Sequence, residues 1–172
     1  MKQGILKVGD EIEIKPGISR KKHDVTEYSA INTKITALYS GEQELQAAQP
    51  SGSLAIQTEL SPELTKADSL AGCIVSTKGN LPEIQYKVRI KVQLFKEVIG
   101  TESKQVVEPI RTNEMILLSV NTAVTVGPVV KMQGNAIELS LKIPVVPLKG
   151  SKIGVARNLQ GHWRLIGWGE IV

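Results

Sequence analysis

Cysteine and aromatic residues are almost missing from this chain of 172 residues. Its one cysteine, Cys73, cannot form a disulfide within the chain, and its place in the apolar run of residues 71–75 predicts a buried thiol in a reducing compartment. Aromatic residues make up only 3% of the sequence, so valine, isoleucine and leucine must build the interior. Because β-branched side chains favour strands, this bias predicts a β-rich fold.

Long hydrophobic runs are missing too. No apolar stretch approaches the roughly 20 residues that a membrane-spanning helix needs. The first residues also lack the basic and then apolar pattern of a signal peptide. We therefore expect a cytoplasmic protein with no membrane partner.

Motifs of catalysis and cofactor binding are not found. A nucleotide-binding loop would need Gly-x-x-x-x-Gly-Lys-Ser/Thr, and a guanine reader would need Asn-Lys-x-Asp. The two histidines, His23 and His162, lie far apart, and no Cys/His cluster has zinc spacing. We expect His23 in a solvated loop and His162 at a turn or strand edge. No serine occupies a Gly-x-Ser-x-Gly elbow, although a Ser/His/Asp triad can assemble from any positions in a chain. The sequence favours a binding protein that has no catalytic residues, metal or cofactor of its own.

The formal net charge of +4 is spread unevenly. Residues 1–82 hold 9 Lys/Arg against 10 Asp/Glu, whereas residues 83–172 hold 12 against 7, a balance of +5. A mildly basic half suggests a polyanionic partner. No Lys/Arg block or patch interleaved with aromatic residues supports that suggestion, so charge alone leaves RNA contact open.

Strand patterns dominate the chain, and no segment keeps a helical period of 3.6 residues. Residues 19–29 are polar and predict an exposed loop, residues 40–44 predict an acidic turn, and Pro62 after Ser61 suits the start of a helical turn. The segments in which apolar and polar residues alternate, or in which apolar residues cluster between turns, are the expected strands: residues 4–15 as a pair around a tight turn, 32–39, 53–58, 70–77, 88–94, 115–120, 122–130, 136–143, 153–158 and 163–172.

These strands predict an all-β fold of two small antiparallel Greek-key β-barrels in tandem. Residues 78–82, which include a glycine and a proline, are the best candidate boundary. We therefore expect one barrel in residues 1–80 and another in residues 83–172.

Four strings are more specific than composition. Residues 6–17, residues 60–68 (Leu-Ser-Pro-Glu-Leu-Thr-Lys-Ala-Asp), residues 107–114 and residues 162–169 (His-Trp-Arg-Leu-Ile-Gly-Trp-Gly) occur in this order along the chain. Together they resemble the second and third domains of the gamma subunit of archaeal and eukaryotic translation initiation factor 2. The resemblance covers essentially the whole chain.

The resemblance implies a fragment of a larger architecture. In the family a GTPase domain, which binds GTP and magnesium and contacts the beta subunit, precedes two β-barrel domains. The chain resembles the barrels alone, and the first strand of the second domain is expected ahead of residue 4 and not within the chain. The intact factor carries initiator methionyl-tRNA to the small ribosomal subunit, so the implied role is a non-catalytic part of that delivery.

The resemblance also implies a site for the acceptor end of the tRNA. The positions that match it are Gly52, Gln57, Thr58, Thr65, Lys66 and Asp68. Gln57 departs from the family pattern, which has glycine there, and its side chain could fill the space of the terminal adenosine. The alternative is that Lys66 and Asp68 only order a turn.

Two further surfaces are implied. Glu42 and Glu44 match the contact with the alpha subunit, against the alternative of a solvated turn. Trp163, Arg164 and Trp168 match a surface for an assembly chaperone or the small ribosomal subunit, and a core role for these residues is equally open.

Two other functions compete with tRNA delivery. The chain could be an interaction or assembly fragment that binds the alpha subunit or the chaperone without touching RNA, which the Gln57 substitution favours. It could also be the barrels of a related translational GTPase, such as a selenocysteine-specific elongation factor, but the string at residues 162–169 argues against that.

Overall fold

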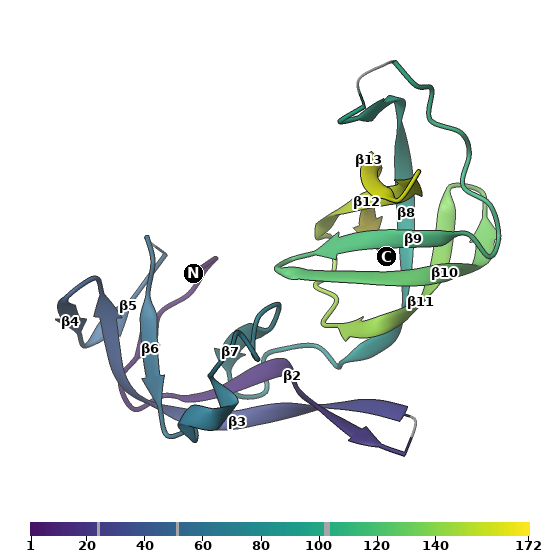
Figure 1. The fold of residues 1–172 in the computed structure, drawn as a ribbon. Coiled ribbons are helices and arrows are strands. Elements are labelled where there is room, and N and C mark those ends of the chain that lie inside the picture. Colours follow the sequence, from purple (N-terminus) through teal and green to yellow (C-terminus); the bar gives the residue numbers. More distant parts are fainter. Residues whose placement is uncertain (24, 51, 102–103) are drawn as a thin grey trace. The chain divides into compact units, whose positions relative to one another are not determined.

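The computed structural model describes residues 1–23, 25–50, 52–101 and 104–172. The chain divides into two compact units, Met1–Leu81 and Pro82–Val172. Both are built from β-strands, and the described residues add a single short 3-10 helix (Figure 1). The all-β prediction is confirmed. No helix in the described part of the chain is long and apolar enough to span a membrane.

The second unit is a closed barrel of six antiparallel strands. Around the barrel their order is β10-β11-β8-β13-β12-β9, and β9 closes the ring on β10. The strands are β8 (Gln85–Ile99), β9 (Met115–Val120), β10 (Ala123–Gln133), β11 (Ala136–Val145), β12 (Lys152–Leu159) and β13 (His162–Ile171). The strands predicted for this half of the sequence are confirmed, with ends that differ by a few residues.

Period-2 alternation builds this barrel. In β9, for example, Ile116, Leu118 and Val120 are buried, whereas Met115 and Ser119 are exposed and Leu117 is half-buried. The inward residues of all six strands join in one hydrophobic core. Each strand therefore has one buried face, as the alternating pattern predicted.

The first unit is more open. A five-stranded sheet has the order β4-β3-β2-β7 with β6 added to β3, and β1 pairs with β5 in a separate two-stranded sheet. Its elements are β1 (Leu6–Lys7), β2 (Glu11–Lys22), β3 (Val25–Ser40), β4 (Gln43–Leu45), β5 (Ala47–Ala48), β6 (Ala55–Thr58), the 3-10 helix η1 (Pro62–Leu64) and β7 (Ile74–Thr77). Of the two predicted barrels, only the second closes among the described strands.

Two local predictions for the first unit are wrong. The tight turn near Gly9 forms, with the Asp10 N–H donating to Lys7 O at 3.1 Å, but the strands on its two sides do not pair with each other. Instead β1 pairs with β5, and β2 pairs with β3 and β7. The loop predicted at residues 19–29 is the end of a long hairpin, because β2 and β3 stay hydrogen-bonded to Lys22 and Val25. Asp24 lies outside the described residues.

Cys73 is half-buried, so the prediction of a buried thiol holds only in part. Its Sγ lies 3.7 Å from Gly17 O. Burial raises the pKa of the thiol, with the contact to Gly17 acting weakly in the other direction. The thiol is therefore protonated near neutral pH.

Candidate functional site

The positions expected to hold a tRNA acceptor end lie along β6 and the turns that follow it. Gly52 precedes the strand and has a positive φ of 41°, whereas Gln57 and Thr58 are its last two residues. Gly52 and Thr58 are therefore at opposite ends of β6 (Figure 1). Ser51, next to Gly52, lies outside the described residues. The predicted positions form a strip along the sheet edge rather than a single cluster.

The end of β6 is anchored on β3. Gln57 pairs with Ala37 and Thr58 with Ile35. The Thr58 side chain is half-buried, and its Oγ1 accepts a hydrogen bond from the Leu60 N–H at 3.4 Å. Gln57 is exposed, so its side chain stands on the open face where the family pattern has a bare glycine.

A series of tight turns follows β6. The predicted helical turn is confirmed as η1 with Pro62 in its first position, although the Ser61 side chain makes no capping bond. The Thr65 N–H and Oγ1–H both donate to Pro62 O, at 3.2 and 3.1 Å. The Ser69 N–H donates to Lys66 O at 3.1 Å, and Ser69 Oγ donates to Leu64 O at 2.5 Å. Backbone groups and two hydroxyls thus order this segment.

The side chains of Lys66 and Asp68 take no part in that ordering. Both residues are exposed, and neither side chain has a hydrogen bond or ion pair within the described part of the chain. Asp68 does serve the turn through its backbone, since it has a positive φ of 54°, which aspartate tolerates better than most residues. Lys66 is presented to solvent by a turn that other groups hold in place.

The acidic turn joins β3 to β4. Glu42 lies in the turn, and Glu44 stands in β4 opposite Tyr39. Both carboxylates are exposed, and no ion pair involves them among the residues that the structure describes. They are available to a basic partner, and a solvated turn has the same geometry.

The tryptophans of β13 lie on the outer wall of the barrel. Trp163 is 38% exposed. Trp168 is half-buried, and the Lys152 ammonium lies 5.0 Å from its ring centroid, within cation–π range. Arg164 is half-buried near Gly100, where its Nη1 comes within 3.4 Å of the position that a Cβ would occupy. The structure therefore does not put these side chains in the hydrophobic core.

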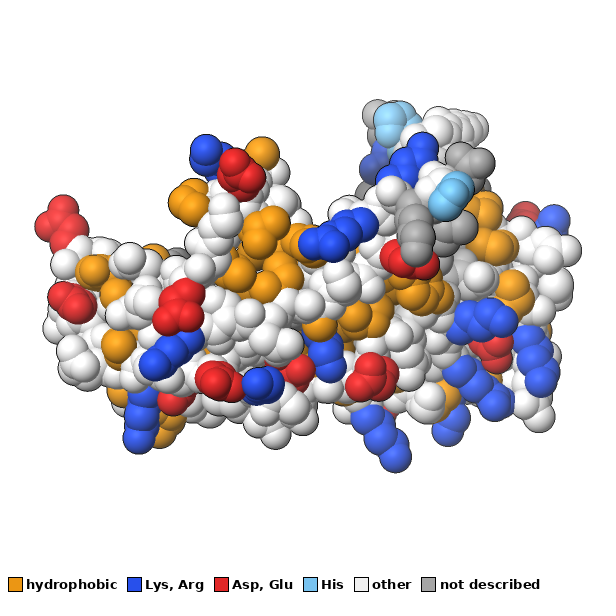
Figure 2. Space-filling model, turned by 90° about the horizontal axis from the view of Figure 1, so that it is seen from below, with side chains coloured by type: hydrophobic (Ala, Val, Ile, Leu, Met, Phe, Trp, Pro, Cys, Tyr) orange, Lys and Arg blue, Asp and Glu red, His pale blue; other side chains and the backbone are white. Residues whose placement is uncertain are grey.

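An apolar row crosses the outer wall between these tryptophans. Residues directly opposite one another in five neighbouring strands form it: Val126, Leu117, Ala156, Leu165 and Ile99. A bulge between Leu165 and Gly167 changes the alternation of β13, so Leu165 and Trp168 both face outward. Figure 2 shows apolar side chains at the surface, interspersed with charged ones, on the face that it displays.

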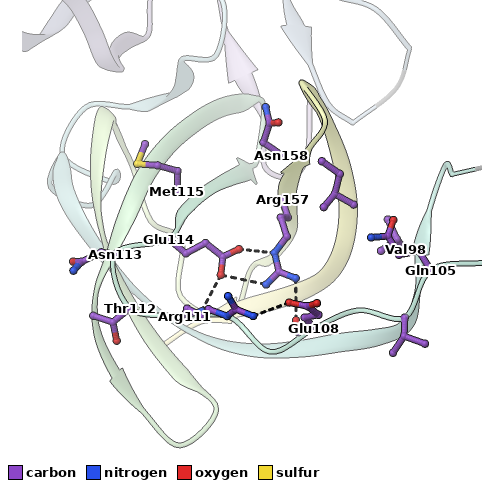
Figure 3. Close-up of a pocket in the computed structure, with 12 residues that line it drawn as sticks. Val98, Gln105, Glu108, Arg111, Thr112, Asn113, Glu114, Met115, Arg157 and Asn158 are labelled. Atoms are coloured by element: carbon purple, nitrogen blue, oxygen red, sulfur yellow. Dashed lines mark hydrogen bonds and ion pairs between the residues drawn. The ribbon is translucent and has the colours of Figure 1, made fainter.

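Sequence reasoning missed one cluster, a hollow of about 550 Å³ beside the barrel (Figure 3). Arg157 lies in its wall and forms an ion pair with Glu114, with Nε 2.5 Å from Oε1. The same guanidinium donates to Glu108 O at 3.0 Å and Pro109 O at 3.1 Å. The only signal in the sequence was that Glu108, Pro109 and Glu114 belong to the string at residues 107–114.

This cluster is structural in character. Every nitrogen of Arg157 that can donate is engaged by an acceptor of the segment 108–114, so the guanidinium fastens this segment to β12. Arg111 adds an exposed ion pair with Glu108 at 2.9 Å. No group of three or more His, Cys, Asp or Glu in the described residues could hold a metal ion.

The fold and its surfaces define a class of protein: an all-β module with a closed barrel that presents exposed polar strips and an apolar outer wall. Comparison with known proteins identifies the family. The model of the family described as "Initiation factor eIF2 gamma, C terminal" matches residues 86–171. The chain belongs to this family of translation initiation factors.

Several archaeal proteins are similar to this chain. Translation initiation factor 2 subunit gamma of Methanococcus maripaludis is 43% identical over 170 residues, which are 99% of this chain and 42% of that protein. The proteins of the same name from Aeropyrum pernix and Pyrococcus furiosus are 45% and 44% identical, over 98% of this chain. The resemblance inferred from the four strings is confirmed. The chain spans about 42% of the length of these relatives.

Proposed function

We propose that this chain supplies the non-catalytic binding surfaces of a translation initiation factor that delivers initiator methionyl-tRNA to the small ribosomal subunit. The observation that carries the proposal is the identity of 43% over 99% of the chain with the gamma subunit of translation initiation factor 2. In this proposal GTP hydrolysis and contact with the beta subunit belong to a GTPase domain outside these residues. The units correspond to two barrel domains, residues 1–80 and residues 83–172.

The acceptor end of the tRNA binds along β6 and the following turns. Lys66 supports this assignment because it is an exposed cation that its own fold does not use, on a turn held by other groups. Thr58 and Thr65 add hydroxyls, and Gly52 adds bare backbone, which suit a ribose and a phosphate. Asp68 lies beside them on the same turn.

In this proposal the side chain of Gln57 limits the affinity of β6 for the acceptor end. Replacement of Gln57 by glycine restores the family pattern and clears the exposed face of β6. We expect Gln57→Gly to strengthen binding of methionyl-tRNA by about tenfold, which equals about 1.4 kcal/mol. Binding of labelled methionyl-tRNA to the full chain measures this effect.

Ala55→Gly is the matched control, because Ala55 is exposed two residues earlier on the same face of β6. Both variants lose the same strand propensity, so only Gln57→Gly should gain affinity. Equal affinities of the two variants for methionyl-tRNA would contradict the proposal that the acceptor end binds at β6.

The alpha subunit binds at the acidic turn. Exposed carboxylates at Glu42 and Glu44, without ion pairs among the described residues, support a contact with basic side chains of the partner. We expect Glu44→Lys to weaken alpha-subunit binding by about tenfold, since like charges then face each other. Calorimetry with the isolated alpha subunit measures it, with Glu59→Lys as a control at another exposed glutamate. An unchanged affinity would contradict the contact and favour the alternative, that this turn is only solvated.

The outer wall of the second unit binds an assembly chaperone or the small ribosomal subunit. Trp163, Trp168 and the two exposed members of the apolar row, Leu165 and Ile99, support this assignment, because exposed apolar patches mark interaction sites. Arg164 lies between Trp163 and Leu165 in the same strand, so its side chain leaves the opposite face of β13 and its cation is not part of the apolar row.

An interaction fragment without RNA contact is the second candidate. The exposed side chain of Gln57, where the family pattern has glycine, is the observation that favours it. Alpha-subunit binding that persists while methionyl-tRNA binds only at the nonspecific, salt-sensitive level would select this candidate.

A further inference from the structure

The far ends of β2 and β3 form a two-stranded ribbon, residues 18–22 paired with residues 25–29, which we name the basic ribbon. β7 pairs with β2 only from Ile12 to Lys15, and β4 and β6 join β3 only from Ile35 onward. Within the described residues the strands of the ribbon therefore pair with no other strand, and the ribbon extends beyond the sheet of its own unit (Figure 1).

Packing does not explain why the ribbon exists. Ser19, Arg20, Lys21, Thr26 and Glu27 are all exposed, and none belongs to a hydrophobic core. A two-stranded ribbon without a third strand or a buried face is marginally stable in water. A feature that adds little to stability and projects from the sheet is suited to binding.

The base of the ribbon is nevertheless constrained. Gly17 has a positive φ of 80°, and a Cβ there would lie 2.0 Å from Ser29 O. The register also shifts between Ile14 and Ile18, which marks a bulge and bends the hairpin. The two strands thus approach each other closely at this point, and the direction of the ribbon is set by the backbone.

Strand pairing gathers cations and hydroxyls that are separate in the sequence. On one face Ser19 lies opposite Tyr28, and Lys21 lies opposite Thr26. On the other face Arg20 lies opposite Glu27, yet no ion pair joins them. Both faces therefore carry a cation with no salt-bridge partner among the described residues.

We propose that the basic ribbon binds the phosphate backbone of a folded RNA. Arginine, lysine, serine, threonine and tyrosine are the side chains that contact phosphates, and Arg20, Lys21, Ser19 and Thr26 offer this chemistry in a narrow projection. The wide, shallow groove of an RNA helix, bordered by phosphates, admits such a contact. The proposal rests on the proposed function only for the class of partner, since a translation factor meets folded RNA.

The test uses the full chain and an initiator tRNA transcript that lacks its 3′ CCA end. The variant Arg20→Ala/Lys21→Ala removes both cations, and Lys7→Ala/Lys34→Ala removes two exposed lysines elsewhere in the same unit. Anisotropy titrations between about 50 and 200 mM salt give the affinity and its salt dependence. We expect the ribbon variant to bind roughly tenfold more weakly than the control variant and to lower the salt slope by about 2.

Each outcome decides the proposal. Equal losses in the two variants would show a general charge effect and would overturn it, as would an unchanged affinity of the ribbon variant. Loss of binding to a polyglutamate probe with intact RNA binding would indicate an acidic protein partner instead.

The acceptor-end proposal fails independently of this one. If it is wrong, transcripts with and without CCA bind equally, and Lys66→Ala affects neither of them. The ribbon variant and its control can still be compared by their affinities for the transcript without CCA.

Discussion

At the residue scale, a buried ion pair lies where β2 meets the last residue of the first unit. Glu13 and Lys15 are 5% and 8% exposed, and Lys15 Nζ lies 3.4 Å from Glu13 Oε2. Together they bind both backbone groups of Leu81: the Leu81 N–H donates to Glu13 Oε1 at 2.6 Å, and Lys15 donates to Leu81 O at 3.1 Å. The pair therefore fastens the last residues of this unit to β2.

The charge state of Glu13 follows from these contacts. Burial by itself raises the pKa of the carboxyl group, but the Leu81 N–H, the Lys15 ammonium and the Gly79 N–H together lower it below the ordinary value. Because the folded-state pKa is the lower one, the stabilisation is complete above the unfolded-state pKa of about 4.3. It is lost as the pH falls from there through the folded-state pKa.

Glu13→Gln should lower the free energy of unfolding by about 3 kcal/mol at pH 7, because the buried Lys15 ammonium loses its ion pair with Glu13. The difference from the unsubstituted chain should shrink as the pH falls below the unfolded-state pKa of about 4.3, because protons bind the unfolded carboxylate first and the folded one only at lower pH. Urea unfolding across this pH range measures both effects.

Glu11→Gln is the control for that experiment. Glu11 is two residues away on the same strand, and its ion pair with Lys78 is exposed at both ends. The loss there should stay below about 1 kcal/mol at every pH. Similar losses for the two variants would contradict the role assigned to the buried pair.

At the scale of the elements, β10 and β11 approach each other closely at Gly127. A Cβ on Gly127 would come within 2.0 Å of Ser140 O, so a side chain does not fit without moving the backbone. Next to this point Thr125 is buried, and its Oγ1 both donates to Ile143 O at 2.6 Å and accepts from the Ile143 N–H at 3.2 Å. A side chain thus supplies hydrogen bonds where the register of β11 shifts.

Gly127→Ala should destabilise the second unit by about 3 kcal/mol, because the clash is with backbone. Gly154→Ala should cost less than about 1 kcal/mol, since its new methyl group would meet Leu165 Cδ1 at 3.4 Å and Ser119 Cβ at 3.6 Å, which are ordinary side-chain contacts. Tryptophan fluorescence during urea unfolding reports this unit alone, since Trp163 and Trp168 both lie in it. Equal costs at the two glycines would contradict the close approach.

The elements also show where sequence patterns predict the structure and where they do not. The alternation in β9 identified the strand to the residue, because one of its faces is buried in the core. Among the described residues from 19 to 29, no side chain belongs to a hydrophobic core, so neither polarity nor period could distinguish a ribbon from a loop. The tight turn after β1 was likewise recognised, but the partner of β1 lies some 40 residues further on, in β5.

At the scale of the whole molecule, the described residues form two separate hydrophobic cores. The larger one lies in the second unit and the smaller one in the first, around Ile12, Ile35 and Leu38. The two clusters share no residue. We expect the two units to unfold in separate transitions, because burial in one core does not depend on the other.

Truncation of a single core residue should therefore act on one unit only. Leu38→Ala and Leu118→Ala each remove a fully buried side chain, one from each core, and each should cost about 2–5 kcal/mol. Tryptophan fluorescence should respond to Leu118→Ala alone, whereas far-UV circular dichroism should show both changes. A single transition that moves with either variant would contradict the independence of the units.

The sequence by itself determined the β class, the strands of the second unit and the family. These depend on local alternation around a buried face and on short strings such as residues 60–68 and 162–169, all of which can be read along the chain. Tertiary structure alone decided which strands pair, that the basic ribbon exists, that Arg157 holds Glu114, and that Leu165 lies in line with Ile99 on the outer wall. The physical reason is that Arg157 and Glu114, like Leu165 and Ile99, are far apart in the sequence and meet through register and bulges that no local pattern records. The basic ribbon joins near neighbours, but its polar sequence shows no alternation that would distinguish it from a loop.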